Sequence, residues 1–314
     1  MTKKARSLAR ASFALANLQA ATPKDRNQDV LKGWLFETLY DYYAQALRAD
    51  KVLFASNTGQ QDIRIIENAR YGRCLILDGV VQTTEADEFI YHEMLTHTPI
   101  LAHGDVKSVL IIGGGDGGIA REIAKHPGVK RITMVEIDKG VVEFSKTYLP
   151  NLSLGAFDDP RFELVIQDGA DYVRGKVGPF DVIVVDRTDP FGPGAALYTK
   201  EFYANCRNVL TEKGILVAQN GVPFQQAEEL ADTIRDFKEV FEDWACYIAT
   251  VPSYVGGPMA LSWGSKSAAN RQVSEEVLTQ RFKALDLDTY YYTPAVHKAA
   301  FALPVYIQDA MRCL

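Results

Sequence analysis

Cysteine is scarce in this chain of 314 residues: it occurs four times, and no cysteine has another close to it in the sequence. Cys74, Cys206, Cys246 and Cys313 form no C-x-x-C pair. A structural zinc site or a framework of disulfides is therefore not expected, and a reducing cytoplasm suits this usage of cysteine. We expect no bound metal.

Two other absences exclude whole classes of function. Asp and Glu (40) outnumber Lys and Arg (34), which gives a formal net charge of -6, whereas a protein that binds nucleic acid usually carries a basic face. No run of about 18 apolar residues occurs, so no membrane-spanning helix is predicted. We therefore expect neither a nucleic-acid nor a membrane partner, and the acidic balance is compatible with a small cationic ligand.

The beginning of the chain is basic and contains no acid over residues 1–24. One interpretation is an organellar targeting peptide, because such peptides are poor in acidic residues. The interpretation that we favour is a mobile basic extension over residues 1–33. The alanine-rich part is a poor signal-peptide core because it holds an arginine and an asparagine.

The rest of the chain predicts two domains. Short β-like runs between residues 51 and 84, separated by glycines, indicate a small antiparallel sheet within an N-terminal β-domain over residues 34–86. A helical pattern covers residues 87–101. Apolar strand-like runs then alternate with helical patterns, which predicts an α/β catalytic domain over residues 87–314, built on a doubly wound, mostly parallel, Rossmann-like sheet. Two late β-like runs are expected to close its edge.

Ligands of such sheets bind beyond the carboxyl ends of the strands. The first strand of the alternating region ends in GGGDGG, in which Gly113, Gly115 and Gly118 match the dinucleotide pattern G-x-G-x-x-G. An NAD-dependent dehydrogenase is therefore one interpretation. Asp116 argues against it, because a carboxylate would repel a pyrophosphate and instead suits a ligand with a positive end. Alternatively, Asp116 caps the next helix.

Acids also follow the next two strands. Glu136 can accept two hydrogen bonds from a ribose diol, and Asp168 can accept one from an adenine amino group, with Gly169 giving the base access to the backbone. Each of these acids alone could be a helix N-cap. Together with Asp116 they predict an adenosine pocket with a carboxylate at a cationic, sulfonium-like end, as for ligands of the S-adenosylmethionine type.

The fourth strand ends in VVDRTDPFGPG, which contains Asp186 and Asp189. Transfer from sulfur to an amine needs a neutral amine, and carboxylates can bind the ammonium form and then accept its proton. One acid can serve the attacking nitrogen and the other the far end of a diamine. The prolines and glycines of this stretch fix the loop that aims them. The alternative is a turn with two solvated acids.

These motifs, taken in order, resemble those of the spermidine synthases, the polyamine aminopropyltransferases, and are most similar to the bacterial enzymes. The resemblance extends from about Trp34 to the end of the chain. It rests on QDI, LDGVVQTTEADEFIYHEM, VLIIGGGDGG, MVEID, QDGADYV, DVIVVDRTDPFGPG, VAQNG, VPSYVGG and HKAAFALP.

The resemblance implies an N-terminal β-domain, a methyltransferase-like Rossmann domain and a homodimer or homotetramer. It implies transfer of an aminopropyl group from decarboxylated S-adenosylmethionine, a co-substrate rather than a permanently bound cofactor, to putrescine or a similar polyamine. The products would be spermidine and 5'-methylthioadenosine.

The family's residue roles carry over by position. Asp186 would accept the proton, Asp189 would hold the distal ammonium, and Asp116 would bind the amine of the transferred group. The nucleoside pocket would be lined by Gln61, Glu136, Asp168, Gly169 and Pro193, and the amine channel by Gln82, Tyr91, His92, Gln219 and Tyr254. Without the resemblance, His92 would be interpreted as a histidine of a helix surface or core edge.

Three positions depart from the family's pattern: Arg187 replaces a small residue, Ala195 a glutamate and Ala86 an arginine. An Arg187 that faced the pocket would repel a cationic aminopropyl group by about 4 kcal/mol at ~4 Å and an effective dielectric constant of ~20. It could instead bind a carboxylate. We favour a structural or outward-facing Arg187, because the rest of the diamine-site pattern is intact.

Two alternatives to the aminopropyltransferase remain open at this point, besides the dehydrogenase. The same fold could use S-adenosylmethionine itself to transfer a methyl or 3-amino-3-carboxypropyl group, for which Arg187 is the motive. The chain could also be a catalytically silent homologue that senses a nucleoside or supports an assembly. Retention of Asp116, Asp186 and Asp189 argues against a silent protein.

Overall fold

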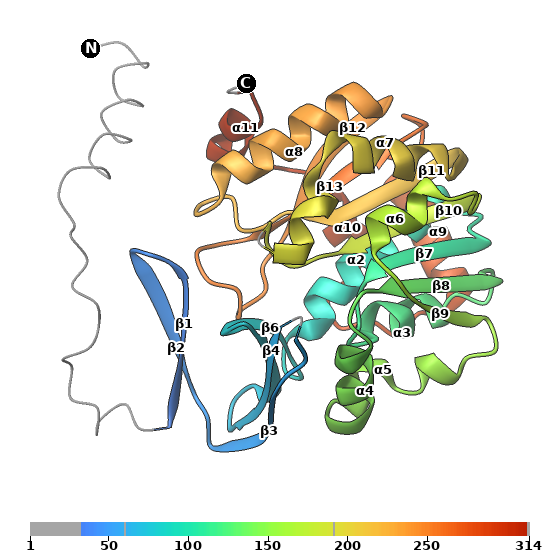
Figure 1. Cartoon of the computed structure of the whole chain (residues 1–314). Helices are drawn as coiled ribbons and strands as arrows, with labels where there is room; N and C mark the ends of the chain where they lie inside the picture. The colour runs from blue at the N-terminus through green and yellow to red at the C-terminus, as the bar shows by residue number, and fades with distance from the viewer. Residues whose placement is uncertain (1–32, 60, 191, 313–314) are drawn as a thin grey trace, which may run out of the picture.

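The computed structural model describes residues 33–59, 61–190 and 192–312, so the expectations for residues 1–32 lie outside the described part. The N-terminal β-domain contains two sheets rather than the single sheet predicted. A hairpin stands apart from the main body (Figure 1) and is followed by a four-stranded antiparallel sheet. Their strands are β1 (Trp34–Tyr40) and β2 (Tyr43–Arg48) in the hairpin, then β3 (Lys51–Asn57), β4 (Asp62–Asn68), β5 (Gly72–Leu77) and β6 (Val80–Thr84).

The catalytic domain is built on a seven-stranded sheet in the order β12-β13-β11-β10-β7-β8-β9. All neighbours from β11 to β9 are parallel, and β13 runs antiparallel to both β11 and β12, which confirms the predicted doubly wound sheet with its closing edge. The strands are β7 (Ser108–Gly113), β8 (Arg131–Glu136), β9 (Phe162–Ile166), β10 (Phe180–Asp186), β11 (Leu210–Gln219), β12 (Asp243–Ala249) and β13 (Met259–Ser265).

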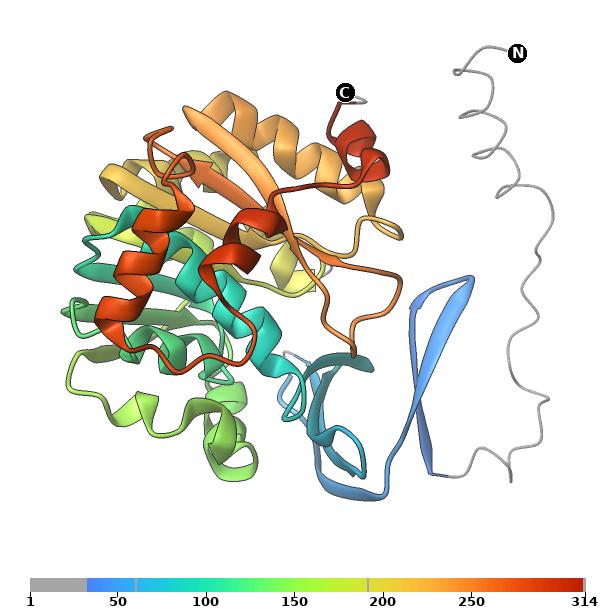
Figure 2. The same cartoon turned by 180° about the vertical axis from the view of Figure 1, so that it is seen from behind.

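Helices cover both faces of this sheet, and alternate residues of each strand face the two layers. Val182 and Val184 of β10 pack in one apolar cluster, whereas Ile183 and Val185 pack in the other. The first cluster includes α2 (Glu88–His103), α3 (Gly118–Ala124), α9 (Glu275–Leu285) and α10 (Pro294–Ala300), of which α2, α9 and α10 lie in front in Figure 2. The second includes α6 (Gly169–Arg174), α7 (Lys200–Asn208) and α8 (Ala227–Val240).

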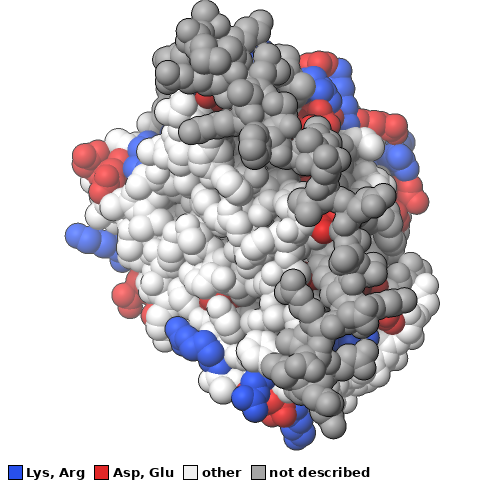
Figure 3. Space-filling view, turned by 90° about the vertical axis from the view of Figure 1, so that its left-hand side faces the viewer, with Lys and Arg blue, Asp and Glu red and all other residues white. Residues whose placement is uncertain are grey.

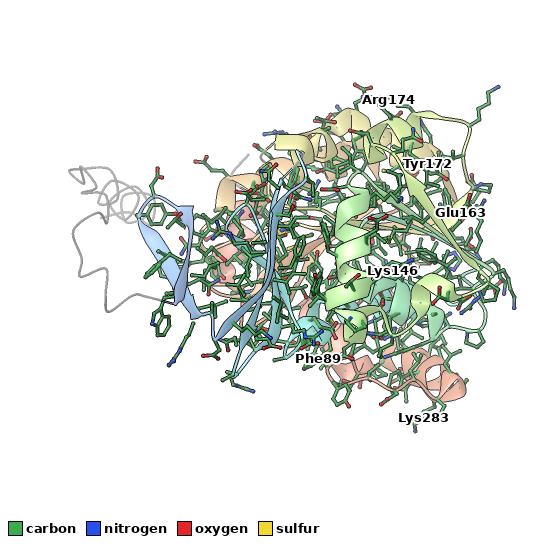
Figure 4. All side chains as sticks on the ribbon, turned by 60° about the horizontal axis from the view of Figure 1, so that its bottom comes forward. Phe89, Lys146, Glu163, Tyr172, Arg174 and Lys283 are labelled. Carbon is green, nitrogen blue, oxygen red and sulfur yellow. The ribbon has the colours of Figure 1, made fainter. Side chains whose placement is uncertain are left out.

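Shorter elements complete the domain. They are α4 (Lys139–Tyr148), α5 (Pro150–Ser153), α11 (Val305–Arg312) and the 3-10 helices η1 (Ala156–Asp158) and η2 (Gly192–Tyr198). In Figure 4 the labelled side chains of Glu163 on β9 and Arg174 on α6 lie at the edge of the molecule opposite the β1–β2 hairpin. The hairpin and β9 therefore mark the two ends of the molecule, with the carboxyl ends of the strands between them.

The sequence analysis did not predict α9, α10 or α11. Helix α9 buries only Leu278, so its apolar face is too weak to produce a helical pattern. Helix α10 did carry a start signal, because Thr293 caps the amide of Val296 and Pro294 occupies the first turn. These helices form by packing against the sheet rather than by their own periodicity.

Glu93 of α2 fixes the connection between α9 and α10. This carboxylate is 1% exposed and accepts hydrogen bonds from three successive backbone N–H groups, those of Tyr290 (2.8 Å), Tyr291 (2.9 Å) and Tyr292 (2.7 Å). A buried carboxylate is tolerated only when its lone pairs are occupied, and here the backbone occupies them. The contact ties the C-terminal helices to the helix that carries Tyr91 and His92.

We expect Glu93→Ala to lower the free energy of unfolding by about 3 kcal/mol, because it leaves three buried backbone N–H groups without their acceptor. Urea denaturation followed by circular dichroism measures this loss. Glu143→Ala is a matched control, since Glu143 is an exposed helical glutamate that only pairs with Lys139. Equal midpoints for the two variants would contradict the anchoring role of Glu93.

Candidate active site

The candidate site lies where the strand order reverses. The chain continues from β7 to β8 and β9 on one side, while β10 pairs with the other side of β7, and this is where doubly wound sheets bind ligands. A cavity of about 300 Å³ opens there, next to a second one of about 80 Å³. Shared walls are formed by Leu39, Val80, Gln82, Tyr91, Asp186, Arg187, Thr188 and Asp189.

The glycine-rich loop after β7 allows neighbouring site residues to approach the backbone. Gly113 has φ +82, and a Cβ there would lie 1.9 Å from the carbonyl oxygen of Asp186. A Cβ on Gly118 would lie 2.2 Å from the ring of His92. The loop thus brings the ends of β7 and β10 and the helix α2 into direct contact. Its glycines have a packing reason that does not involve a pyrophosphate.

Asp116 lies in this loop and forms a buried charged pair with His92. Its Oδ1 accepts a hydrogen bond from Gly118 N (2.8 Å), as expected for a helix-start aspartate, and its Oδ2 lies 3.4 Å from Nε2 of His92. On its other side His92 contacts Glu88, which Arg121 holds with two nitrogens. Burial opposes a charge on the imidazole, but Asp116 and Glu88 outweigh it and raise the pKa of His92 to about 10.

The acids after β8 and β9 lie on the walls of the larger cavity, with Gln61 and Gly169. Burial raises the pKa of Glu136 to about 7, and its Oε1 accepts from the N–H of Asp138 (2.9 Å). Asp168 is the N-cap of α6, where its Oδ1 accepts from the N–H groups of the first turn. Capping occupies one oxygen of each acid and leaves the other for a ligand.

Two of the residues predicted for the nucleoside pocket need separate comment. Gly169 is required by packing, because a Cβ there would lie 2.3 Å from the Cγ2 of Ile112; the predicted reason was access for a base. Pro193 lies in η2, and its side chain is outside the described part of the chain. Gln61 donates to the Oδ2 of Asp138 (3.3 Å), which follows β8, so the N-terminal sheet reaches the nucleoside wall.

Asp186 lies at the junction of the two cavities. Its Oδ1 accepts a hydrogen bond of 2.6 Å from the hydroxyl of Tyr91. Burial and then the negative charge of Asp116 raise the pKa of Asp186 to about 6, against the opposing effects of His92 and Tyr91. A buried carboxylate whose pKa lies near 6 is well suited to accept a proton at neutral pH.

The smaller cavity contains the residues predicted for the amine channel. Asp189 accepts a hydrogen bond from Gln226 (2.7 Å), and burial raises its pKa. The ring of Tyr254 packs edge-on against Tyr91, and its hydroxyl donates to the backbone oxygen of Gln82 (2.6 Å). Gln219 also lines this cavity, whereas His92 lines the larger one, beside Asp116.

Sequence reasoning missed a carboxylate from the hairpin. Glu37 of β1 is 5% exposed, lines the smaller cavity and accepts hydrogen bonds from Val81 N and Gln45 Nε2, each 2.9 Å long. Burial raises its pKa. The signal was present in the sequence: along a strand Glu37 shares a face with Leu35 and Leu39, so it points the same way as apolar residues.

Arg187 is neither aimed at the cavities nor exposed. It is 5% exposed, and its Nε, NH1 and NH2 atoms donate to Gln219 O (3.1 Å), Leu197 O and Tyr203 Oη (2.8 Å), and Asn220 Oδ1 (3.1 Å). The expected outward direction is wrong and the expected structural role is confirmed. The cause is strand alternation: residue 187 continues the face of Ile183 and Val185, opposite to that of Asp186.

Other features bear on the classes excluded earlier. Cys74, Cys206 and Cys246 are buried free thiols. Among the described residues no group of three His, Cys, Asp or Glu side chains could hold a metal ion. A search of the same residues found no helix long and apolar enough to cross a membrane.

Comparisons with known proteins agree with this geometry. A family model described as "Spermine/spermidine synthase domain" matches residues 88–274, and one described as "Spermidine synthase tetramerisation domain" matches residues 33–85. A polyamine aminopropyltransferase of Ruegeria sp. (strain TM1040) is 58% identical over 275 residues, which are 88% of this chain and 97% of that protein. One from Escherichia fergusonii is 53% identical over 280 residues, covering 89% and 97%.

Solved structures give the same result. A spermidine synthase in complex with the transition state analogue AdoDATO superimposes with a TM-score of 0.84 at 36% identity, over 90% of this chain and 95% of that one. The spermidine synthase from Thermotoga maritima gives a TM-score of 0.81 at 35% identity, over 90% and 94%. The chain therefore belongs to the spermidine synthase family and is a polyamine aminopropyltransferase.

Proposed function

We propose that this aminopropyltransferase moves the aminopropyl group of decarboxylated S-adenosylmethionine to putrescine, giving spermidine and 5'-methylthioadenosine. The observation that carries the proposal is the position of Asp186, a carboxylate at the junction of a nucleoside-sized cavity and an acid-lined amine cavity. Glu136, Asp168 and Gln61 would hold the nucleoside in the larger cavity. Asp189 would hold the distal ammonium of the diamine in the smaller one.

The reaction then follows from the charges. The Asp186 carboxylate takes a proton from the attacking ammonium, and the freed lone pair on nitrogen forms a bond to the carbon next to the sulfonium. The carbon–sulfur bond breaks and its electrons return to sulfur, which leaves neutral methylthioadenosine. Asp116 would bind the amine of the transferred group, and Tyr91 holds Asp186 in the direction of attack.

The donor is proposed to be decarboxylated because the site offers no cation for a carboxylate. Arg187 was the motive for S-adenosylmethionine itself, but its guanidinium is held by protein acceptors on the other face of the sheet. Acids face the cavities from both sides, at Glu37, Asp116, Asp186 and Asp189. An all-cationic pair of substrates fits this arrangement better than an anionic group does.

We further propose a homodimer or homotetramer in a reducing cytoplasm. The match to a tetramerisation domain over residues 33–85 supports an oligomer. The face that carries the hairpin is mostly uncharged in its described part, with charges gathered toward the rim (Figure 3), and exposes Trp34, Phe36, Tyr42 and Tyr43. Such apolar surface is typical of interfaces. The buried thiols support the reducing setting.

The donor and acceptor are tested directly. We expect the protein to release methylthioadenosine from decarboxylated S-adenosylmethionine when putrescine is present, with spermidine formed in equal amount, as measured by liquid chromatography. Parallel reactions use S-adenosylmethionine as donor and cadaverine, agmatine or spermidine as acceptor. Turnover with S-adenosylmethionine alone, or no release with any of these amines, would overturn the proposal.

We expect Asp186→Asn to lower kcat about 100- to 10,000-fold, the range for loss of a general base. Asp181→Asn is the control, because Asp181 lies at the other end of the same strand and accepts from the N–H groups of Lys107 and Ser108. That variant should keep the wild-type kcat. Steady-state kinetics on both variants decide the matter: equal kcat values would remove Asp186 from the chemistry.

The pH dependence is expected to report Asp186. Since the base must be deprotonated, kcat/KM should fall as the pH drops through about 6, the pKa of Asp186. Tyr91→Phe removes a hydrogen bond to the charged form, so this acid limb should move to higher pH. Asp116→Asn removes a neighbouring negative charge and should move the limb of its remaining activity to lower pH. Shifts of the same sign in both variants would exclude Asp186 as the titrating group.

A further inference from the structure

Arg187 directly follows Asp186, yet the proposed reaction gives it no task. A buried guanidinium is costly unless its donors find acceptors. Here the side chain is 5% exposed, and each nitrogen of the guanidinium has a partner. The question is what these partners gain from the arrangement.

The partners come from three elements that follow β10 in the chain. Gln219 O and Asn220 Oδ1 belong to the end of β11, and Tyr203 Oη belongs to α7. Leu197 O belongs to η2, and the ring of the next residue, Tyr198, stacks on the guanidinium with its centroid 3.3 Å from the Cζ. Arg187 therefore joins η2 to the end of β11 by hydrogen bonds and a cation–π contact.

Each of the two η2 residues held in this way forms part of a substrate wall. The side chain of Leu197 lines the larger cavity, opposite Gly169. The hydroxyl of Tyr198 lies 3.0 Å from the side-chain oxygen of Gln219, which lines the smaller cavity. The same guanidinium thus fixes one residue beside the nucleoside and, through Tyr198, one beside the amine.

We propose that Arg187 is a positioning residue that ties Leu197 and Tyr198 of η2 to the end of β11, and so sets one wall of the nucleoside cavity and one wall of the amine cavity. The assignment of the two cavities rests on the proposed function. Arg187 touches neither substrate, so its effect passes through Leu197 on one side and through Tyr198 and Gln219 on the other.

Arg187→Lys and Arg187→Met test the proposal. Lysine keeps the charge but has one compact ammonium that cannot bridge all four acceptors; methionine removes the charge. For both variants we expect the KM for putrescine and the Kd for methylthioadenosine to rise about 10-fold or more, with a lower kcat, because small displacements of positioned groups are costly. Steady-state kinetics and isothermal titration calorimetry measure these constants, and hydrogen exchange over residues 195–199 should become faster.

Tyr198→Phe separates the two walls. It keeps the stacked ring and the contact to Leu197 but removes the hydroxyl that faces Gln219. We expect a higher KM for putrescine and an unchanged Kd for methylthioadenosine. A rise in both constants would contradict the division of labour between Leu197 and Tyr198. This variant also keeps the proposal testable if Arg187→Met does not fold.

Arg131→Met is the matched control. Arg131 also stacks on an aromatic ring, with Cζ 4.5 Å from the centroid of Phe180, and donates to the oxygen of Pro179 (3.0 Å), but at the amino end of β10. It should lower the melting temperature and leave KM and Kd unchanged. If the Arg187 variants behave in the same way, Arg187 only stabilises the fold and the proposal is overturned.

The outcome is distinguishable from a failure of the proposed function. If the wild type does not release methylthioadenosine from decarboxylated S-adenosylmethionine and putrescine, the proposed reaction is wrong. Binding of methylthioadenosine and hydrogen exchange over residues 195–199 are measured without turnover. An unchanged Kd together with unchanged exchange in Arg187→Lys would therefore overturn the positioning role alone.

Discussion

The site depends on the parallel pairing of β10 with β7. This register sets Asp186 opposite Gly113, and the glycine lets the carbonyl oxygen of Asp186 approach the turn after β7 more closely than any side chain would permit. The carboxylate therefore emerges at the switch point of the sheet, where helix α2 brings Tyr91 to meet it. Nucleoside and amine cavities share this point because two strand ends and one helix converge on it.

Burying several carboxylates together requires compensation. Asp116 and Asp186 raise each other's cost of ionisation, and His92 offsets part of it from α2. Behind His92, charges of alternating sign continue through Glu88 and Arg121. The site can therefore keep its acids ionised before a cationic ligand arrives. Charge compensation from inside the fold replaces the water that an exposed acid would use.

Much of the catalytic domain could be predicted because its strands are apolar and its helices amphipathic. The acids after β7, β8, β9 and β10 could be placed together for a simple geometric reason: parallel strands end at one edge. Glu37 was missed because an acid in a short hairpin strand resembles a surface residue until the strand is known to face a cavity. Helices α9 to α11 were missed because tertiary contacts such as those of Glu93, rather than local periodicity, hold them in place.

Arg187 shows both the reach and the limit of such reasoning. Its presence beside Asp186 raised the right question, and strand alternation alone could have answered which face it occupies. Its acceptors could not have been foreseen, since Tyr203, Leu197 and Asn220 meet it only after η2, α7 and β11 have folded back over β10. A departure from a family's pattern can thus be absorbed behind the site while the chemistry in front of it stays the same.

The β1–β2 hairpin has one further consequence. Glu37 and Tyr40 line the amine cavity, and the hydroxyl of Tyr40 donates to Gln226 (3.0 Å), which also holds Asp189. The same hairpin lies within the region matched by the tetramerisation domain. Occupancy of the amine cavity and association of subunits therefore act on one element, and thermodynamic reciprocity requires that whatever one does to the other is returned in equal measure. Protein concentration becomes a variable of acceptor affinity, much as an effector would be.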